Sequence, residues 1–250
     1  MLGMRKQISA VVVAVCAASA LTHGGAVAQP VLPDPAPTGM SNGQLYGVTQ
    51  VGTGGATPDG AGRWQLTVNT IQGGDPRVAD TFNRASDNSA RGQLDEARAG
   101  ATTDGTWTFD TAPTIHFGAA SVSQLISGLF NAVPSAHPVN YVSTVVIDSR
   151  TATPITLGDL FVDEQAGLNR LSEQTKILLP AESGQPVGTF DDDPGAEPVD
   201  SNFANWIPTP AGLEIHFEDY QFFHGTPVVT VPWQAFDGLL RPEMDALRLP

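Results

Sequence analysis

Residues 121–147 read SVSQLISGLFNAVPSAHPVNYVSTVVI, and this stretch predicts a long β-hairpin. Serine alternates with apolar residues over 121–130, which is the period of two expected when one face of a strand is buried. Residues 141–147 are β-branched and apolar, as in a second strand. The segment 133–138 between them contains two prolines, which favour a turn. The hairpin indicates an antiparallel sheet.

The chain after the hairpin predicts one helix, three further strands and a closing amphipathic helix. The segment 155–161 (ITLGDLF) leads into the first helix, which we expect to bury three leucines and to end at Pro180, because proline disrupts a helix interior. The three leucines are Leu168, Leu171 and Leu178. The strands are expected over 203–207, 213–217 and 228–231. The closing helix is expected to bury Trp233, Phe236, Leu239 and Leu240.

The chain before the hairpin combines strands with one helix. Asp75 and Pro76 predict the start of that helix, because aspartate caps a helix N-terminus and proline is tolerated at the first helical position. Apolar residues at helical spacing continue to about Arg98. Strands are expected over 45–51, 64–71, 107–110 and 114–117, with the glycine-rich segment 52–62 dividing the first two.

These elements predict an α+β fold, in which an antiparallel-rich β-sheet carries a few helices packed on it. We expect a single compact domain over residues 45–242, of one or two lobes. The segment 29–44, rich in proline, alanine and glycine, is expected to be a flexible N-terminus of the mature chain.

The first 28 residues have the three-part layout of a secretory signal peptide. Arg5 and Lys6 give a basic start, an apolar run follows over 8–21, and Ala26-Val27-Ala28 places small residues where signal peptidase needs them. The apolar run is shorter than the roughly 20 residues that a transmembrane helix needs. We therefore expect a secreted, extracellular protein that begins at Gln29, without a transmembrane anchor, either released or associated with the cell wall.

Composition excludes several classes of function for this mature protein. The only cysteine, Cys16, would leave with the signal peptide, which excludes disulfides, thiolate nucleophiles and cysteine metal sites. Loss of Arg5 and Lys6 would take the formal net charge from −14 to −16. A surface this acidic repels nucleic acid and anionic lipid headgroups. Solubility is the simplest explanation of the charge, and attraction of a cationic partner is the alternative.

The order of elements in the second half resembles a known group of extracellular domains. The succession comprises Ala136-His137-Pro138 at the hairpin turn, ITLGDLF at 155–161, a helix, GLEIHF at 212–217, Tyr220-Gln221 and VTVPW at 229–233. It is similar to the extracellular domain of the RsiV anti-sigma factors and, within that group, to the secreted mycobacterial immunogenic protein 64 family. The resemblance covers residues 121–240, and more loosely the part from Leu45.

The resemblance implies an extracellular domain that is a secreted antigen or a lysozyme sensor and is not catalytic. It implies a cationic protein such as lysozyme, or a cell-envelope component, as the partner. At the turn the sensors carry Gly-Gly-Ala-His-Gly, of which only Ala136 and His137 match here, and the antigens carry cysteines that this mature chain lacks. No sigma-binding or transmembrane segment is visible, so the anti-sigma role does not carry over. Abundant alanine, glycine and proline, with far more arginine than lysine, are consistent with an actinobacterial source.

Four side chains are the candidates for a binding site. His137 lies at the hairpin turn, where we expect it mainly to stiffen the chain. Glu214, His216 and Glu218 alternate with apolar residues along one strand and are expected to share one face. Two carboxylates beside an imidazole suit a metal or acid–base chemistry, and the other explanation is a solvated strand face. His116 lies in a similar setting.

An acidic loop is the last candidate. Its carboxylates could attract calcium, but Gly195 is misplaced for a calcium-loop register, which favours a hydrated loop. With no nucleophile-elbow or zinc-protease motif, the sequence predicts a secreted, non-catalytic binding or antigen-type protein without cofactor or metal. The alternatives are an extracytoplasmic hydrolase or metal-dependent enzyme that uses carboxylates and His216, and an antigenic scaffold without a ligand. The loop carboxylates are Asp191, Asp192, Asp193, Glu197 and Asp200.

Overall fold

The predicted hairpin is present at the centre of the molecule. A computed structural model describes residues 37–101, 105–135 and 137–249, so the predicted signal peptide and its cleavage site lie outside the described residues. The hairpin strands β5 (Ser121–Val133) and β6 (Val139–Asp148) pair antiparallel in continuous register. The fold is α+β as predicted, and none of the helices in these described ranges is long and apolar enough to cross a lipid bilayer.

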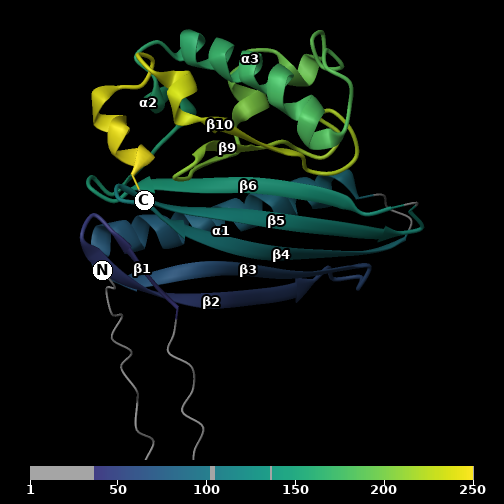
Figure 1. Cartoon of the computed structure of the whole chain (residues 1–250). Coiled ribbons are helices and arrows are strands. Elements are labelled where there is room, and N and C mark those ends of the chain that lie inside the picture. The colour runs from purple at the N-terminus through teal and green to yellow at the C-terminus, as the bar shows by residue number, and fades with distance from the viewer. Residues whose placement is uncertain (1–36, 102–104, 136, 250) are drawn as a thin grey trace, which may run out of the picture. The chain divides into compact units, whose positions relative to one another are not determined.

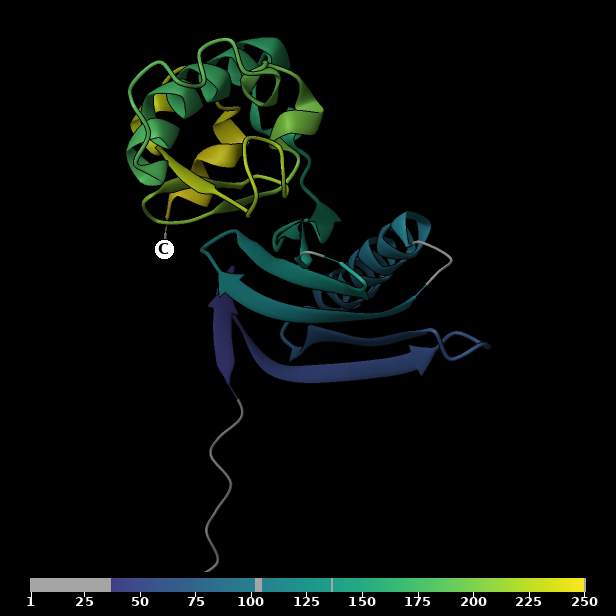
Figure 2. The same cartoon turned by 90° about the vertical axis from the view of Figure 1, so that its right-hand side faces the viewer.

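The hairpin belongs to a seven-stranded sheet. The other strands are β1 (Thr38–Ser41), β2 (Gln44–Ala56), β3 (Gly62–Gly73), β4 (Thr106–Phe117) and β7 (Thr153–Pro154). The strands lie side by side in chain order, and every neighbouring pair is antiparallel except β3 and β4, which are parallel. The helix α1 (Pro76–Gly100) connects that parallel pair, and Figure 2 shows the sheet curving around it.

The start of α1 follows from its first residues. The Asp75 side chain accepts a hydrogen bond from the Arg77 backbone N–H, and Pro76 takes the first helical position, as the sequence predicts. The helix buries one apolar stripe against the sheet, and this burial is the main stabilising term for an amphipathic helix. The stripe includes Val78, Ala79, Phe82, Ala90, Leu94 and Ala97.

Side chains complete the sheet where β3 and β4 separate. The two strands pair only from Gly62↔Trp107 to Gln65↔Asp110. Beyond that point Thr111 Oγ1 bonds to the backbone of Thr67, accepting from its N–H at 2.7 Å and donating to its carbonyl at 2.9 Å. On α1, Asn83 bonds in the same way to both backbone groups of Ile71, at 2.8 and 3.0 Å. These side chains satisfy backbone groups that a neighbouring strand would otherwise pair.

A second lobe packs on the face of the sheet away from α1. Its helices are α2 (Leu157–Leu160) and α3 (Glu164–Ser183), and its strands β8 (Trp206–Pro208), β9 (Gly212–His216) and β10 (Val228–Pro232) form an antiparallel sheet in the order β10-β9-β8. Figure 1 shows α3 above β9 and β10, with β6 below them. The backbone N–H of Trp206 donates to Thr144 Oγ1 of β6, which ties the two sheets together.

The second lobe differs from the predicted elements in three places. Pro180 lies inside α3, which continues to Ser183 and ends at Gly184 in the left-handed conformation, with a φ of 66°. Glycine adopts that conformation without strain, so it terminates the helix, and the proline is accommodated in the last turn. The strand predicted over 203–207 begins only at Trp206, because Phe203 belongs to a short 3-10 helix, Asp200–Phe203. The closing segment is a pair of 3-10 helices, Trp233–Phe236 and Pro242–Arg248.

The first lobe also differs from the sequence prediction. Thr38–Ser41 forms β1 within the segment expected to be flexible, and it is held by antiparallel pairing with β2. Residues 106–117 form one strand instead of two. The glycines at 52–55 continue β2, and at Gly55 a Cβ would overlap the indole ring of Trp64 on β3. Glycine here therefore allows close packing of an aromatic side chain.

Candidate functional site

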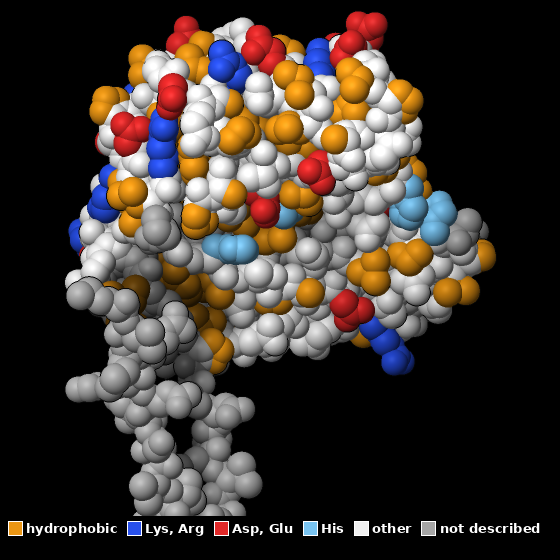
Figure 3. Space-filling view, viewed as in Figure 1, with side chains coloured by type: hydrophobic (Ala, Val, Ile, Leu, Met, Phe, Trp, Pro, Cys, Tyr) orange, Lys and Arg blue, Asp and Glu red, His pale blue; other side chains and the backbone are white. Residues whose placement is uncertain are grey.

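The hairpin turn meets a loop of the second lobe at an exposed group of aromatic and imidazole rings. The ring centroids of His137 and His224 are 4.5 Å apart, and Tyr220 stacks on His224 at 5.1 Å. The Tyr220 hydroxyl lies 3.0 Å from His137 Nε2. Phe223 is next to them in the loop, with 36% of its surface exposed. We call these four residues the aromatic–histidine surface, and Figure 3 shows histidines gathered at the hairpin-tip end of the molecule beside apolar side chains.

Asp219 holds the loop that carries this surface. Its side chain is only 2% exposed, and its Oδ1 accepts hydrogen bonds from Gly225 N at 2.6 Å and His224 Nδ1 at 3.0 Å. Its Oδ2 accepts from the backbone and side-chain amides of Asn140 on β6. Burial raises the pKa of Asp219, but these hydrogen bonds together outweigh burial and hold the pKa below its ordinary value. The loop is therefore fixed to the hairpin through an ionised carboxylate.

Tyr220 is held in a backbone conformation that is unfavourable for its residue type. Its φ is +66°, in the left-handed region, and its side chain is 52% exposed. The next residue, Gln221, anchors the loop through bonds from its Nε2 to the carbonyls of Gly195 and Asn202, at 2.9 and 3.0 Å. Strained residues persist when their surroundings fix them, and they cluster at binding sites. The arrangement therefore presents a fixed, exposed tyrosine.

Glu214 and His216 lie on β9 as a hydrogen-bonded pair, with 2.8 Å between Oε1 and Nε2. His216 is only 8% exposed and the Glu214 side chain is 28% exposed, so the imidazole is packed while the carboxylate is partly open to solvent. The hydrogen bond to His216 holds the pKa of Glu214 below its ordinary value, although burial opposes this shift. His116 of β4 is nearby, and burial lowers its pKa. The negative charge of Glu214 opposes this shift, whereas His216 lowers the pKa of His116 further.

Glu218 does not share the face of Glu214 and His216, so that part of the prediction is wrong. β9 ends at His216, and the chain leaves the sheet before Glu218. Glu218 instead borders a small cavity with Glu96 of α1 and residues of β6. Partial burial of its carboxyl group raises the pKa of Glu218, and the like charge of Glu96 adds to the shift.

The acidic loop is structured around backbone hydrogen bonds. Asp193 caps the 3-10 helix Pro194–Ala196 by accepting from Gly195 N at 2.8 Å, and Gly195 itself is buried. Asp191, Asp192 and Glu197 are exposed. Across the ranges that the structure covers, no three histidine, cysteine, aspartate or glutamate side chains are grouped so that they could hold a metal ion.

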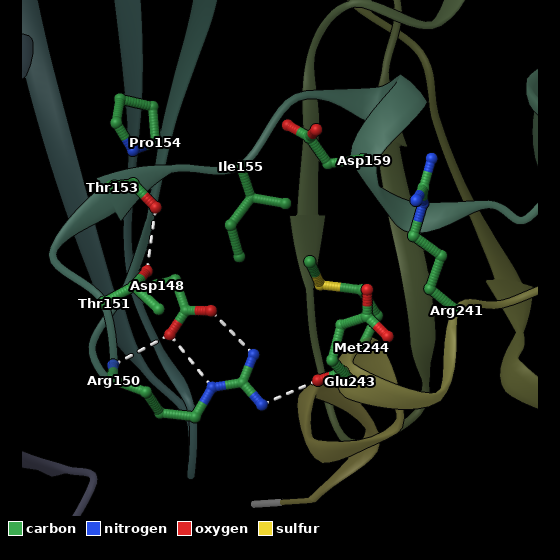
Figure 4. Close-up of a pocket in the computed structure, with 10 residues that line it drawn as sticks. All are labelled: Asp148, Arg150, Thr151, Thr153, Pro154, Ile155, Asp159, Arg241, Glu243 and Met244. Atoms are coloured by element: carbon green, nitrogen blue, oxygen red, sulfur yellow. Dashed lines mark hydrogen bonds and ion pairs between the residues drawn. The ribbon is translucent and has the colours of Figure 1, made fainter.

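A cavity that the sequence did not reveal lies between the end of β6, α2 and the last 3-10 helix. It has a volume of about 550 Å³ and is lined by charged and apolar side chains, including Arg150, Asp159, Arg241 and Glu243. Figure 4 shows that these residues come from both sides of the cavity. No local motif joins them, because Arg150 and Arg241 are brought together only by packing of distant segments.

Comparison with known proteins defines the fold. No family model matches the chain, and no curated protein matches it. Among solved structures, a DUF3298 family protein from Pseudomonas aeruginosa has a TM-score of 0.56 at 15% identity, covering 79% of this chain and 95% of that one. A DUF3298 family member from Bacteroides fragilis has a TM-score of 0.53 at 11% identity, covering 83% of this chain and 98% of that one. At these identities the likeness establishes a common fold alone.

Proposed function

We propose that this chain is a secreted, non-catalytic binding protein that holds a cationic protein through the aromatic–histidine surface. The observation that carries the proposal is the pre-ordered loop, in which Asp219 and Gln221 fix the exposed rings of Tyr220 and His224. Aromatic side chains that are already fixed lose little conformational entropy on binding, and such residues dominate the affinity of protein interfaces.

The charge of the chain supports a basic partner. The formal net charge is −14, and Glu218 and Glu96 lie together beside Asn140, close to the loop. Opposite net charges speed encounter, and an aromatic face attracts arginine and lysine through cation–π interactions. A lysozyme-like protein would bring both features: positive charge and exposed arginines.

The family resemblance supports the same proposal. The order of elements over residues 121–240 is similar to the RsiV-type extracellular domains and the immunogenic protein 64 family, whose members include lysozyme sensors and secreted antigens. We infer that the chain belongs with these domains and is extracellular, released or bound to the cell wall. A cell-envelope component is the other ligand class consistent with the resemblance, and binding to isolated cell-wall material would distinguish it from a protein partner.

Calorimetry with lysozyme at low and at physiological salt tests the proposal. We expect binding that weakens as salt rises, since screening acts over about 8 Å at physiological ionic strength. Tyr220→Ala should weaken it about tenfold or more, whereas Val187→Ala, at a 92% exposed apolar residue in a different loop, should leave it unchanged. Cytochrome c, a basic protein of similar size and unrelated shape, is the second control. If lysozyme and cytochrome c bind with equal affinity, and Tyr220→Ala changes neither affinity, the interaction is only non-specific attraction between opposite charges.

The alternative of a hydrolase or metal-dependent enzyme rests on Glu214 and His216. These residues bond to each other, and His216 is 8% exposed, which leaves its imidazole little access to a substrate. Glu214→Gln separates the two proposals: it should abolish any hydrolytic activity of an enzyme and leave lysozyme binding unchanged in a binding protein.

A further inference from the structure

The cavity beside the last 3-10 helix has the features of a small-ligand site. Its volume of about 550 Å³ falls within the range of small-molecule pockets. Ile155, which is buried, and Met244 supply apolar surface beside the charged lining residues. We call this cavity the junction pocket, because β6, β7, α2 and Pro242–Arg248 meet there.

Arg150 is already neutralised within the junction pocket. Its Nε and Nη2 form a bidentate pair with the Asp148 carboxylate at 3.0 and 2.6 Å, and its Nη1 donates to the Glu243 carbonyl at 2.6 Å. Asp148 is 4% exposed, and the bonds from Arg150 hold its pKa below the ordinary value against the opposing effect of burial. This pair therefore fastens the last 3-10 helix to the β6–β7 turn and leaves little charge for a ligand.

The Arg241 guanidinium is held in place through Nε, while its terminal nitrogens are open to a ligand. Its Nε donates to the Phe161 carbonyl at 2.9 Å, and its backbone N–H donates to the Leu160 carbonyl at 2.8 Å. Its two terminal nitrogens have no hydrogen bond or ion pair with any residue that the structure describes. A guanidinium fixed at its base offers parallel N–H groups that match a carboxylate.

Two carboxylates complete the charged lining. Asp159 Oδ2 accepts hydrogen bonds from the backbone N–H and the side-chain hydroxyl of Thr156, at 2.8 and 2.6 Å. These bonds hold the pKa of Asp159 below its ordinary value, and the positive charge of Arg241 lowers it further. The Glu243 carboxylate has no hydrogen bond or ion pair to the residues described. A simple anion would meet repulsion from both carboxylates, and a simple cation would meet repulsion from Arg241.

We propose that the junction pocket binds a short peptide with free ends, whose carboxylate pairs with Arg241 and whose ammonium group faces Asp159 and Glu243. A zwitterion satisfies both signs of charge at once, and the apolar surface of Ile155 and Met244 accommodates an aliphatic side chain beside the charged ends. This site is separate from the aromatic–histidine surface, and its occupancy does not depend on the proposed function.

Four versions of one tripeptide test the assignment by calorimetry on the purified chain. The probes are Ala-Leu-Ala, its N-acetyl form, its C-terminal amide and the doubly blocked form. Ala-Leu-Ala should bind, and blocking either end should weaken binding about tenfold, as expected for loss of a charge-assisted hydrogen bond. Equal affinity for all four peptides, or no binding of Ala-Leu-Ala at millimolar concentration, would overturn the proposal.

Variants then assign each end of the peptide. Arg241→Gln should make Ala-Leu-Ala bind as weakly as its amide, because the carboxylate has lost its partner, and Glu243→Gln should reduce the penalty for N-acetylation. The Glu243 carboxylate and the Nη atoms of Arg241 form no hydrogen bond or ion pair with the described residues, and Arg241→Gln gives up only the Nε bond to the Phe161 carbonyl, so both variants should fold. Arg91→Gln and Glu182→Gln, at exposed positions outside the pocket, remove the same charges and should change nothing. Equal effects at the pocket and control positions would refute the assignment.

Discussion

Asp219 and Asn140 are joined by two hydrogen bonds across 79 residues of sequence, at 2.8 Å from the backbone N–H and 3.0 Å from the side-chain amide. Through the other oxygen, the same carboxylate bonds to His224 and Gly225. One buried side chain therefore fixes the loop of the second lobe to the central hairpin. The relationship explains how residues from two distant segments form one surface.

Asp219→Ala should destabilise the protein by about 1.5–3 kcal/mol, because it leaves buried amide donors without their charged acceptor. Urea unfolding followed by circular dichroism measures this change. Asp237→Ala is the matched control, since Asp237 is 67% exposed and its ion pair with Arg248 lies at the surface; its cost should be about 0.5 kcal/mol or less. Equal costs at the two positions would contradict the structural role of Asp219.

Acid should weaken the fold through the same carboxylate. The folded pKa of Asp219 lies below the ordinary value of 3.8, so the unfolded chain binds more protons between those two values. The stabilisation is therefore complete above pH 3.8 and is lost as the pH falls through the folded pKa. Urea midpoints from pH 6 down to pH 2 should decline less steeply for Asp219→Asn than for the native chain. Parallel profiles would exclude this contribution.

Asn83 should stabilise the separated edge of β3. Asn83→Ala removes both side-chain bonds to the Ile71 backbone and should cost about 1–3 kcal/mol in thermal or urea unfolding, because those groups then lose their partners. Asn88→Ala, at an exposed asparagine of the same helix, makes the identical change without that loss and should be close to neutral. A neutral Asn83→Ala would show that water replaces the side chain at this edge.

Local patterns were sufficient to predict the hairpin and α1. Alternation over 121–130 and the capping pair Asp75-Pro76 act through neighbouring residues, so their consequences follow from the sequence nearby. The parallel pairing of β3 with β4 could not be predicted in this way, since it joins strands across a whole helix. At Pro180 the pattern was misleading, because tertiary packing of Leu179 and the cap at Gly184 outweigh the local cost of proline.

The candidate sites were predictable only in part. The sequence identified His137 and the pair Glu214 and His216, but the partners of His137 come from a loop more than eighty residues away. The sequence around Tyr220 does not indicate its left-handed backbone conformation, which depends on the hydrogen bonds that Asp219 and Gln221 make with distant segments. The open guanidinium of Arg241 in the junction pocket likewise exists only because distant segments pack together.

The left-handed backbone of Tyr220 predicts a conflict between stability and binding. Tyr220→Gly and Tyr220→Ala both remove the ring, but the glycine variant should be about 1 kcal/mol more stable, because alanine at φ +66° stays strained. At Val187, which does not have a positive φ, the order should reverse, with Val187→Gly no more stable than Val187→Ala. Thermal unfolding of the four variants measures both differences. The same order at both positions would mean that the Tyr220 backbone is not strained in solution.

His137 provides the sharpest test of the aromatic–histidine surface. The sequence suggests a residue that only stiffens a turn, whereas the structure places its ring against Tyr220 and His224. Because His137 is exposed, His137→Ala should cost less than about 1 kcal/mol of stability. Its effect on lysozyme binding should nevertheless depend on Tyr220. In a double-mutant cycle, His137→Ala should weaken binding in the native background and do little in Tyr220→Ala, since residues in contact couple. Additive effects would return His137 to the role of a turn residue and confine the binding surface to the loop after β9.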